Sequence, residues 1–159
     1  MKYKLTEETI VYCGITLHRI ECTEAFANVE VGEKGGYIEK ISNLSQSGNA
    51  WVCGDAKVYG NAEVYGNAWV CGNAKVCGDA WVCGNAEVYG LNDYIVFKNN
   101  WSSGRYFTWT RSNDMWKVGC FYGTGEELIK KAYKDSENNG KHYEAYVRFV
   151  EQLKAIQKQ

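Results

Sequence analysis

A six-residue phrase, Gly-(Asn/Asp)-Ala-x-Val-y, recurs seven times between residues 48 and 90 and constrains this chain more than any other feature. Within each phrase Ala and Val alternate with variable residues, which is the two-residue period of a β-strand. The Gly-Asn or Gly-Asp pair tolerates left-handed backbone angles and therefore turns the chain. Short strands and corners that repeat without a break predict a coil of three phrases, the hexapeptide β-solenoid.

Three phrases per coil, or about 18 residues, determine which outward side chains lie above one another. Because neighbouring strands are about 4.8 Å apart, Trp51 is expected to lie over Trp69. Facet one carries Trp51, Cys53, Trp69, Cys71, Glu87 and Tyr89; facet two carries Lys57, Tyr59, Lys75 and Cys77; facet three carries Glu63, Tyr65, Trp81 and Cys83. The inward positions are the Ala and Val of every phrase. A flat sheet of short hairpins is the competing interpretation, but identical turns at a strict period of six favour the coil.

The chain before the perfect phrases is expected to complete and cap the coil. Ile38 and Leu44 are six residues apart and in phase with Ala50, so GGYIEKISNLSQSGNA is interpreted as a degenerate first coil. The stretch YKLTEETIVYCGITLHRIECTEAF alternates around Gly14, which is typical of a β-hairpin. A hairpin at the open end would protect exposed strand edges from pairing. Residues 1–90 are therefore interpreted as one unit, a capping hairpin plus the solenoid.

Residues 91–159 are predicted to form a small α+β module, in which a β-hairpin is followed by two helices. DYIVFK and GRYFTWTRSNDMWKVGCF alternate like strands, with a turn at residues 112–114. Thr124 and Glu127 have the spacing of a capping box at the start of the first helix. ENNGK is expected to break the helical pattern, and HYEAYVRFVEQLKAIQ supplies the second helix. Because a module of this size has a marginal core, it is expected to lean on the solenoid or on a partner.

Several stretches also resemble a known group of sequences. KLTEETI, GITLHRIE and GGYIEKISNLSQSGNAWV precede the GNAxVxG phrases. A GCF-x-GT-x-x-E pattern follows them at Gly119, Cys120, Phe121, Gly123, Thr124 and Glu127. In this order they resemble a broad group of uncharacterised phage and prophage hexapeptide-repeat proteins along nearly the whole chain. The resemblance implies a left-handed coil, a phage origin and expression in a bacterial host, and it supplies no activity.

Charge and hydropathy argue against two classes of partner. The chain has 18 basic and 19 acidic residues, for a net charge of −1, which gives no electrostatic footprint for nucleic acid or an anionic membrane. No apolar run approaches the roughly 20 residues of a membrane helix. The N-terminus lacks the apolar run of a signal peptide. We therefore expect a cytoplasmic protein, in the cytosol of the bacterial host.

The cysteines do not predict a metal site. The chain has seven, none in a CxxC motif, and Cys71, Cys77 and Cys83 point from three different facets, so they cannot share a zinc ion. Cys53 shares facet one with Cys71 and could approach it, but a cytosol disfavours a disulfide. No metal, cofactor or catalytic residue is expected.

Outward aromatic residues are the strongest functional signal, because Trp and Tyr are preferred anchors at interfaces. The candidate interface residues are Trp51, Trp69, Tyr89, Trp81, Tyr59 and Tyr65. Coverage by the capping hairpin or by the C-terminal module is the plain alternative. Facet one is the most apolar facet, so it is expected to be buried, against another copy or under the C-terminal module. Contact between copies would make a homo-oligomer, a dimer or trimer.

These features favour a non-catalytic, phage-encoded binding protein that inhibits a host protein, in an anti-CRISPR or other anti-defence role. The first alternative is a sponge that holds a small molecule or cyclic nucleotide between subunits, with a base stacked on Trp or Tyr. The second is a hexapeptide-type acyltransferase, a class that typically uses a histidine as base. The only histidines, His18 and His142, both lie outside the perfect repeat.

Overall fold

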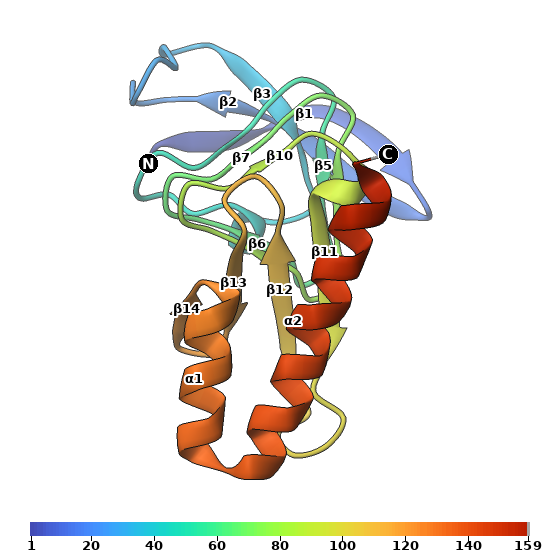
Figure 1. Cartoon of the computed structure of the whole chain (residues 1–159). Helices are drawn as coiled ribbons and strands as arrows, with labels where there is room; N and C mark the ends of the chain where they lie inside the picture. Colours follow the sequence, from blue (N-terminus) through green and yellow to red (C-terminus); the bar gives the residue numbers. More distant parts are fainter. Residues whose placement is uncertain (159) are drawn as a thin grey trace.

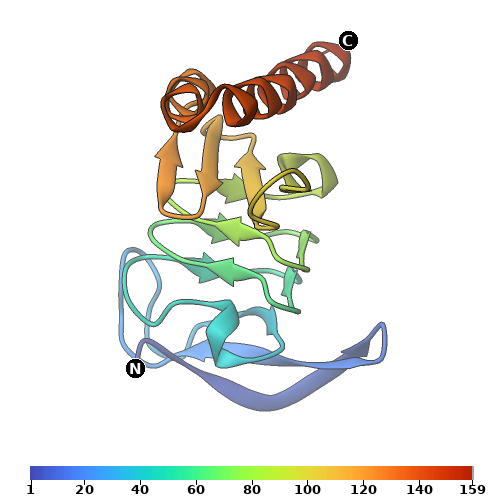
Figure 2. The ribbon, with the colours of Figure 1, turned by 90° about the horizontal axis from the view of Figure 1, so that it is seen from below.

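The computed structural model describes residues 1–158 as a mainly β protein built in layers (Figure 1). The last position of the module predicted at 91–159 therefore lies outside the described residues. An N-terminal hairpin forms one end, and short parallel strands of the repeat follow (Figure 2). An antiparallel sheet and two helices form the other end. The predicted mainly β class, the N-terminal hairpin and the two C-terminal helices are confirmed.

The N-terminal hairpin consists of β1 (Tyr3–Tyr12) and β2 (Ile15–Cys22), which pair antiparallel. The turn between them lies at Cys13 and Gly14, both with positive φ, as the Gly14 turn signal predicted. β3 (Lys34–Ile38) pairs antiparallel with β2 on one side and parallel with a repeat strand on the other. It therefore joins the hairpin to the repeat in one continuous sheet.

The repeat forms seven two-residue strands that pair only in parallel. They are β4 (Trp51–Val52), β5 (Lys57–Val58), β6 (Glu63–Val64), β7 (Trp69–Val70), β8 (Lys75–Val76), β9 (Trp81–Val82) and β10 (Glu87–Val88). The pairing orders are β4-β7-β10, β3-β5-β8 and β6-β9. Trp51 pairs with Trp69 and Trp69 with Glu87, so the predicted register, three phrases per step, is confirmed.

Glycine is required at the corners by backbone conformation and by space. The first residue of each phrase has positive φ; at Gly66 the value is 68°. A β-carbon on Gly66 would lie 3.1 Å from the backbone nitrogen of Gly84, the equivalent corner one layer further on. The residues that follow the corner glycines form a ladder, in which Asn61 Nδ2 donates to Asp79 Oδ1 at 3.2 Å. These corners therefore stack backbone on backbone and amide on carboxylate.

The inward Ala and Val residues form the core of the repeat, as predicted. They are all 0–1% exposed and belong to one apolar cluster together with Tyr3, Ile20 and Val29 of the N-terminal region. The repeat positions are Ala50, Ala56, Ala62, Ala68, Ala74, Ala80, Ala86 and Val52, Val58, Val64, Val70, Val76, Val82, Val88.

The predicted phase of the first, degenerate layer is wrong. Ile38 pairs with Val58 and Leu44 bridges to Val64, so both occupy Val positions and are not in phase with Ala50. The segment after Leu44 is longer than a normal corner, which moves the register. Asn43, fully buried, fills the space by donating from Nδ2 to backbone carbonyls of the layer below, at 2.8 Å to Ala62.

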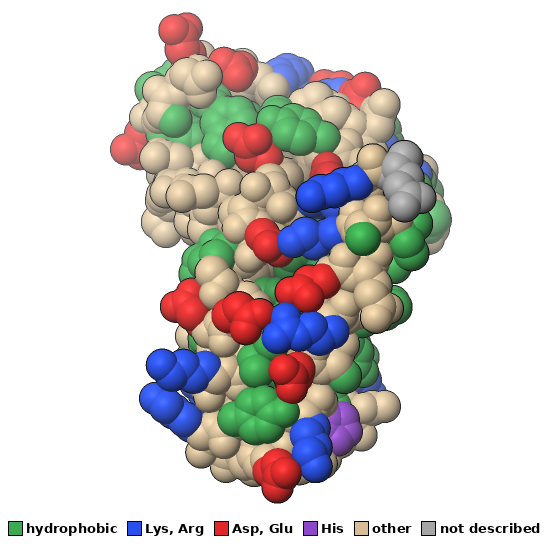
Figure 3. All heavy atoms as spheres, viewed as in Figure 1, with side chains coloured by type: hydrophobic (Ala, Val, Ile, Leu, Met, Phe, Trp, Pro, Cys, Tyr) green, Lys and Arg blue, Asp and Glu red, His purple; other side chains and the backbone are tan. Residues whose placement is uncertain are grey.

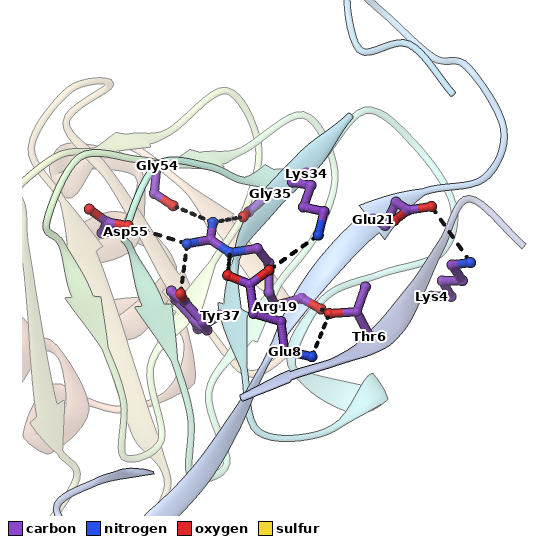
Figure 4. A network of polar contacts seen from close by, with 10 residues as sticks. All are labelled: Lys4, Thr6, Glu8, Arg19, Glu21, Lys34, Gly35, Tyr37, Gly54 and Asp55. Carbon is purple, nitrogen blue, oxygen red and sulfur yellow. Dashed lines mark hydrogen bonds and ion pairs between the residues drawn. The ribbon is translucent and has the colours of Figure 1, made fainter. Parts of the chain in front are cut away.

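Arg19 fastens the hairpin to the repeat (Figure 4). Its guanidinium donates to the carbonyl oxygen of Gly35 at 2.7 Å and to the Tyr37 hydroxyl at 2.6 Å. It also pairs with Glu8 at 3.0 Å and with Asp55, at a repeat corner, at 3.5 Å. One partly buried side chain therefore joins β1, β2, β3 and the first perfect phrases.

The C-terminal sheet has four strands and not the predicted hairpin. They are β11 (Tyr94–Lys98), β12 (Tyr106–Thr110), β13 (Met115–Val118) and β14 (Phe121–Gly123), antiparallel in chain order. A tight turn at Gly119, with φ 54°, reverses the chain so that β14 adds to the sheet. The sequence stretch GCF, interpreted as the end of a strand, therefore contains a turn.

Helices α1 (Gly125–Asp135) and α2 (Glu137–Gln157) pack on this sheet. The Thr124–Glu127 capping box is confirmed, with Thr124 Oγ1 accepting from the Glu127 amide at 3.2 Å. The predicted break at ENNGK is wrong, because the helices separate at Ser136, which caps α2, and α2 runs through the stretch. Gly140 is buried there against the Tyr133 ring, where any β-carbon would collide. The glycine therefore serves close packing between the helices.

The four-stranded sheet covers the far end of the repeat. The Trp81 amide donates to Thr108 Oγ1 at 3.0 Å, and the Tyr94 hydroxyl donates to the Lys75 carbonyl at 2.8 Å. The module therefore leans on the repeat, as expected for a small core. Figure 3 shows basic and acidic side chains interspersed on the helical end of one face. Within residues 1–158, no helix has the length and apolarity needed to cross a membrane.

Candidate aromatic binding surface

Trp51 does not belong to an outer surface, so its assignment as an interface residue is wrong. Its side chain is 1% exposed and packs edge-to-face against Phe26, at 5.3 Å between ring centroids, and Tyr3, at 6.4 Å. The N-terminal region thus covers the first layer of facet one, where another copy or the C-terminal module was expected. Further along facet one, Trp69 is partly buried and Tyr89 is 55% exposed.

Facet two is covered by the tip of the N-terminal hairpin. Tyr59 is partly buried, and Tyr12 packs edge-to-face on it at 5.8 Å between centroids. The ammonium groups of Lys57 and Lys75 lie 5.5 and 4.9 Å from the Tyr12 ring centre. Cation–π contacts therefore hold Tyr12 in place, and Tyr12 covers Tyr59 through an aromatic contact.

Facet three keeps its aromatic residues accessible. Trp81 begins β9 and is 37% exposed, whereas the chemically identical Trp51 position is closed. Tyr65 follows β6 one layer earlier, is partly buried, and meets Trp81 edge-to-face at 6.5 Å. The parallel pairing of β6 with β9 brings these two side chains together.

A hollow of about 480 Å³ opens beside this pair. Its floor contains Tyr65, Trp81 and Leu44, and its wall is the 3₁₀ turn Ile41–Asn43 with the segment that follows. Ile41, 42% exposed, gives this wall an apolar side chain, and Ser42, Ser45 and Gln46 add polar groups beside it. The volume lies within the range of about 300–1,000 Å³ that is usual for ligand and anchor pockets.

A second hollow, of about 320 Å³, lies on the other side of Trp81, where the repeat meets the C-terminal sheet. Asp79, Arg105, Tyr106 and Gly119 complete its lining. Lys117 Nζ is 5.8 Å from the Trp81 ring centre. We refer to Ile41, Tyr65, Trp81, Arg105 and Tyr106, with the two hollows between them, as the Trp81 surface.

The Tyr65 hydroxyl and the Cys83 thiol stay protonated near neutral pH. Burial, with the Cys83 thiol beside the hydroxyl, raises the pKa of Tyr65 well above its ordinary range. Burial also raises the pKa of the Cys83 thiol. A protonated, buried thiol is a poor nucleophile. In these protonated forms Tyr65 and Cys83 provide contact area and hydrogen-bonding groups.

The expectation that Cys53 and Cys71 remain thiols is wrong in this structure, which joins them in a disulfide. Both follow paired strands of facet one, β4 and β7, so their Cα atoms are 4.6 Å apart. That spacing falls within the range of about 4.4–6.8 Å that a disulfide requires. Parallel stacking thus places two like residues in bonding position without any backbone adjustment.

The histidines lie at opposite ends of the molecule. His18 is in β2, with Nδ1 3.3 Å from the Thr6 carbonyl oxygen. His142 is in α2 and stacks on Trp101 at 4.5 Å between ring centroids. Neither contacts the Trp81 surface. In the described part of the chain, no three His, Cys, Asp or Glu side chains are grouped closely enough to hold a metal ion.

No protein-family model matches the chain, and no curated protein is significantly similar to it.

The sequence identified part of this surface and missed the rest. Trp81 and Tyr65 stood out because the repeat register makes both outward. Arg105, Tyr106 and Ile41 carried no signal, since they reach the surface from the β11–β12 loop, from β12 and from an irregular turn. Only the docking of the C-terminal sheet on the last layer of the repeat brings them beside Trp81.

Proposed function

We propose that the chain is a non-catalytic binding protein whose Trp81 surface receives an aromatic or aliphatic anchor of a protein partner. The observation that carries this proposal is the asymmetry among outward Trp residues, since Trp51 is closed by the chain itself while Trp81 stays open between two hollows. Exposed aromatic side chains beside concave apolar walls are the usual composition of interface hot spots.

The proposed scaffold for this surface is a left-handed hexapeptide β-solenoid. Support comes from the strictly parallel two-residue strands, the constant register and the positive φ of the corner glycines. A coil of this kind is rigid, because each layer is hydrogen-bonded to its neighbours along the whole stack. Rigidity reduces the entropy lost when a partner binds.

The proposed partner is a bacterial host protein, and the proposed role is inhibition of host defence. The motifs shared with phage and prophage sequences are the reason for this choice. The same motifs are the reason for proposing a location in the bacterial cytosol. Self-association remains a separate proposal, for which the exposed side chains of Tyr89 and Leu91 on the flank of facet one provide the surface.

The test compares affinity capture by three proteins from lysate of the bacterial host: wild type, Tyr65→Ala with Trp81→Ala, and Tyr89→Ala. The Tyr89 variant is the control, because it removes an aromatic side chain that is more exposed than Trp81, 55% against 37%, from another facet. We expect one stoichiometric host protein to bind wild type and the control. The double variant should bind it at least about 30-fold more weakly, as for loss of a hot spot.

Two results would count against the proposal. Equal affinity of all three proteins for the captured host protein would remove the Trp81 surface from the interface. A small molecule that co-purifies with wild type, with no protein captured, would favour the sponge alternative.

A further inference from the structure

A second concave site lies in the C-terminal module and adjoins the Trp81 surface, with which it shares Arg105. Its volume is about 540 Å³, and it opens where the β11–β12 loop, the β13–β14 turn, α1 and the start of α2 meet. Apolar side chains line it from the sheet and both helices: Val118, Phe121, Leu128, Ala132 and Tyr143. Polar groups at its edge come from Ser102, Ser103, Arg105, Lys131, Asp135 and Asn139.

The polar edge is held in place before any ligand arrives. Asn99 is 2% exposed, and its Oδ1 accepts from the backbone amides of Trp101 and Ser102 at 3.1 and 2.9 Å. Its Nδ2 donates to the Tyr143 hydroxyl at 3.3 Å. Trp101 Nε1 donates to Asn139 Oδ1 at 2.8 Å, which ties the loop to α2. Preorganisation of this kind lowers the entropic cost of binding.

Arg105 is the cation without a counter-ion at this site. Among residues 1–158 it takes part in no ion pair, whereas Lys131 is paired with Asp135 at 3.3 Å. The guanidinium lies over Gly119, where a β-carbon would collide with it. The guanidinium thus lies directly against the β13–β14 turn, where the positive φ of Gly119, 54°, favours glycine.

We propose that this cavity binds a small organic monoanion, a carboxylic acid with an apolar body. The carboxylate would accept hydrogen bonds from Arg105, whose planar guanidinium suits bidentate recognition. The apolar body would lie on Phe121, Leu128 and the Tyr143 ring. A dianion fits less well, because Arg105 is the one unpaired cation and Asp135 adds a negative charge at the edge. This proposal does not depend on the proposed protein partner.

Cys120 supplies a reporter for the test, since it lines the cavity and its thiol is exposed and free. In a Cys13→Ser background, which removes the other exposed free cysteine, the rate of Cys120 alkylation by iodoacetamide is followed by peptide mass spectrometry. The probes are 3-phenylpropionate and its neutral isostere 3-phenylpropanamide. We expect the acid to slow alkylation in a saturable manner and the amide to have no effect.

Two variants assign the effect to Arg105. In Arg105→Gln, the acid should protect Cys120 with an affinity lower by roughly tenfold or more, because a charge-assisted hydrogen bond is lost. Lys134→Gln, on the same helix as Lys131 but outside the lining, should behave as wild type. Equal protection by acid and amide, unchanged protection in Arg105→Gln, or no protection by millimolar acid would overturn the proposal. The comparison of acid with amide uses unaltered cavity residues, so it holds even if a variant folds poorly.

Discussion

Trp51 and Trp81 occupy the same position of the repeated phrase, so truncating each to alanine separates the effect of sequence from that of tertiary coverage. Trp51 is 1% exposed and is enclosed by Tyr3, Phe26 and the repeat, whereas Trp81 is 37% exposed beside open hollows. Truncating a fully buried Trp to alanine costs about 3–5 kcal/mol, through lost transfer energy and the cavity left behind. An exposed Trp of the same repeat should cost about 1 kcal/mol.

The polar atom of Trp51 provides a second comparison. Its Nε1 is buried and has no hydrogen-bond partner in the described chain. An unpaired buried donor costs about 1–3 kcal/mol, which offsets part of the favourable burial of the ring. Trp51→Phe removes that donor while keeping an aromatic ring between Tyr3 and Phe26. We therefore expect Trp51→Phe to lose about 1.5 kcal/mol at most, far less than Trp51→Ala.

Urea unfolding followed by circular dichroism gives the free energies of unfolding for wild type, Trp51→Ala, Trp51→Phe and Trp81→Ala. Similar m-values across the set would show that the denatured states are comparable. Equal losses for Trp51→Ala and Trp81→Ala would refute the assignment of Trp51 to the core and of Trp81 to the surface. A loss for Trp51→Phe as large as that for Trp51→Ala would refute the unpaired Nε1 argument.

Three further outcomes follow from single features of the fold. Burial lowers the pKa of Lys2 from 10.5 to about 8, so between these values the unfolded chain keeps a proton that the folded chain has lost. Wild type should therefore gain stability relative to Lys2→Met as pH rises from 8 towards 10.5, and parallel urea curves would contradict this. Replacing Cys53 and Cys71 by serine should cost about 3 kcal/mol for a closed loop of this length, and a reductant should destabilise wild type but not the variant. Thr124→Ala should cost about 1 kcal/mol by loss of the capping box, measured by urea unfolding against Ser103→Ala, an exposed serine outside any helix.

The repeat register could be predicted because one short phrase specifies both the strand and the corner. Alternation placed Val70 inside and Trp69 outside, and the period placed Trp51 over Trp69. The phase of the first layer could not be predicted, since three residues, 45–47, separate Leu44 from the Gly48-Asn49 corner, where a perfect phrase has one, and interrupt the period of six. Contacts with Lys2 hold this segment, and no pattern in the sequence predicts them. A pattern fixes register only where the pattern itself is unbroken.

The candidate site was predictable only where the repeat alone determines it. Outward orientation of Tyr65 and Trp81 follows from their place in the phrase, whereas exposure depends on what else packs there. The disulfide illustrates the same limit. The register correctly placed Cys53 beside Cys71, but free thiols were expected because a cytosol is reducing. Arg105 reaches both the Trp81 surface and the large cavity through a loop of no regular structure, which no periodicity reveals.

The N-terminal region covers aromatic residues on facets one and two, which explains why accessible aromatic residues beside a hollow remain on facet three. The N-terminal region closes facet one at Trp51 through Phe26, and the hairpin tip closes facet two at Tyr59 through Tyr12. On facet three the N-terminal region contributes only the short turn Ile41–Asn43, which forms a wall beside Tyr65 and Trp81 and leaves the hollow open. The C-terminal sheet meets Trp81 through Thr108 and Tyr106 and also leaves its ring partly exposed. The fold does not require an aromatic residue at the x position of the phrase, which Trp81 occupies. Lys75 occupies the same position of another phrase, on facet two, and its side chain is exposed. If the Trp81 surface binds a partner as proposed, replacing Trp81 should weaken binding while changing the free energy of unfolding little, and a loss of stability as large as that for Trp51→Ala would contradict this.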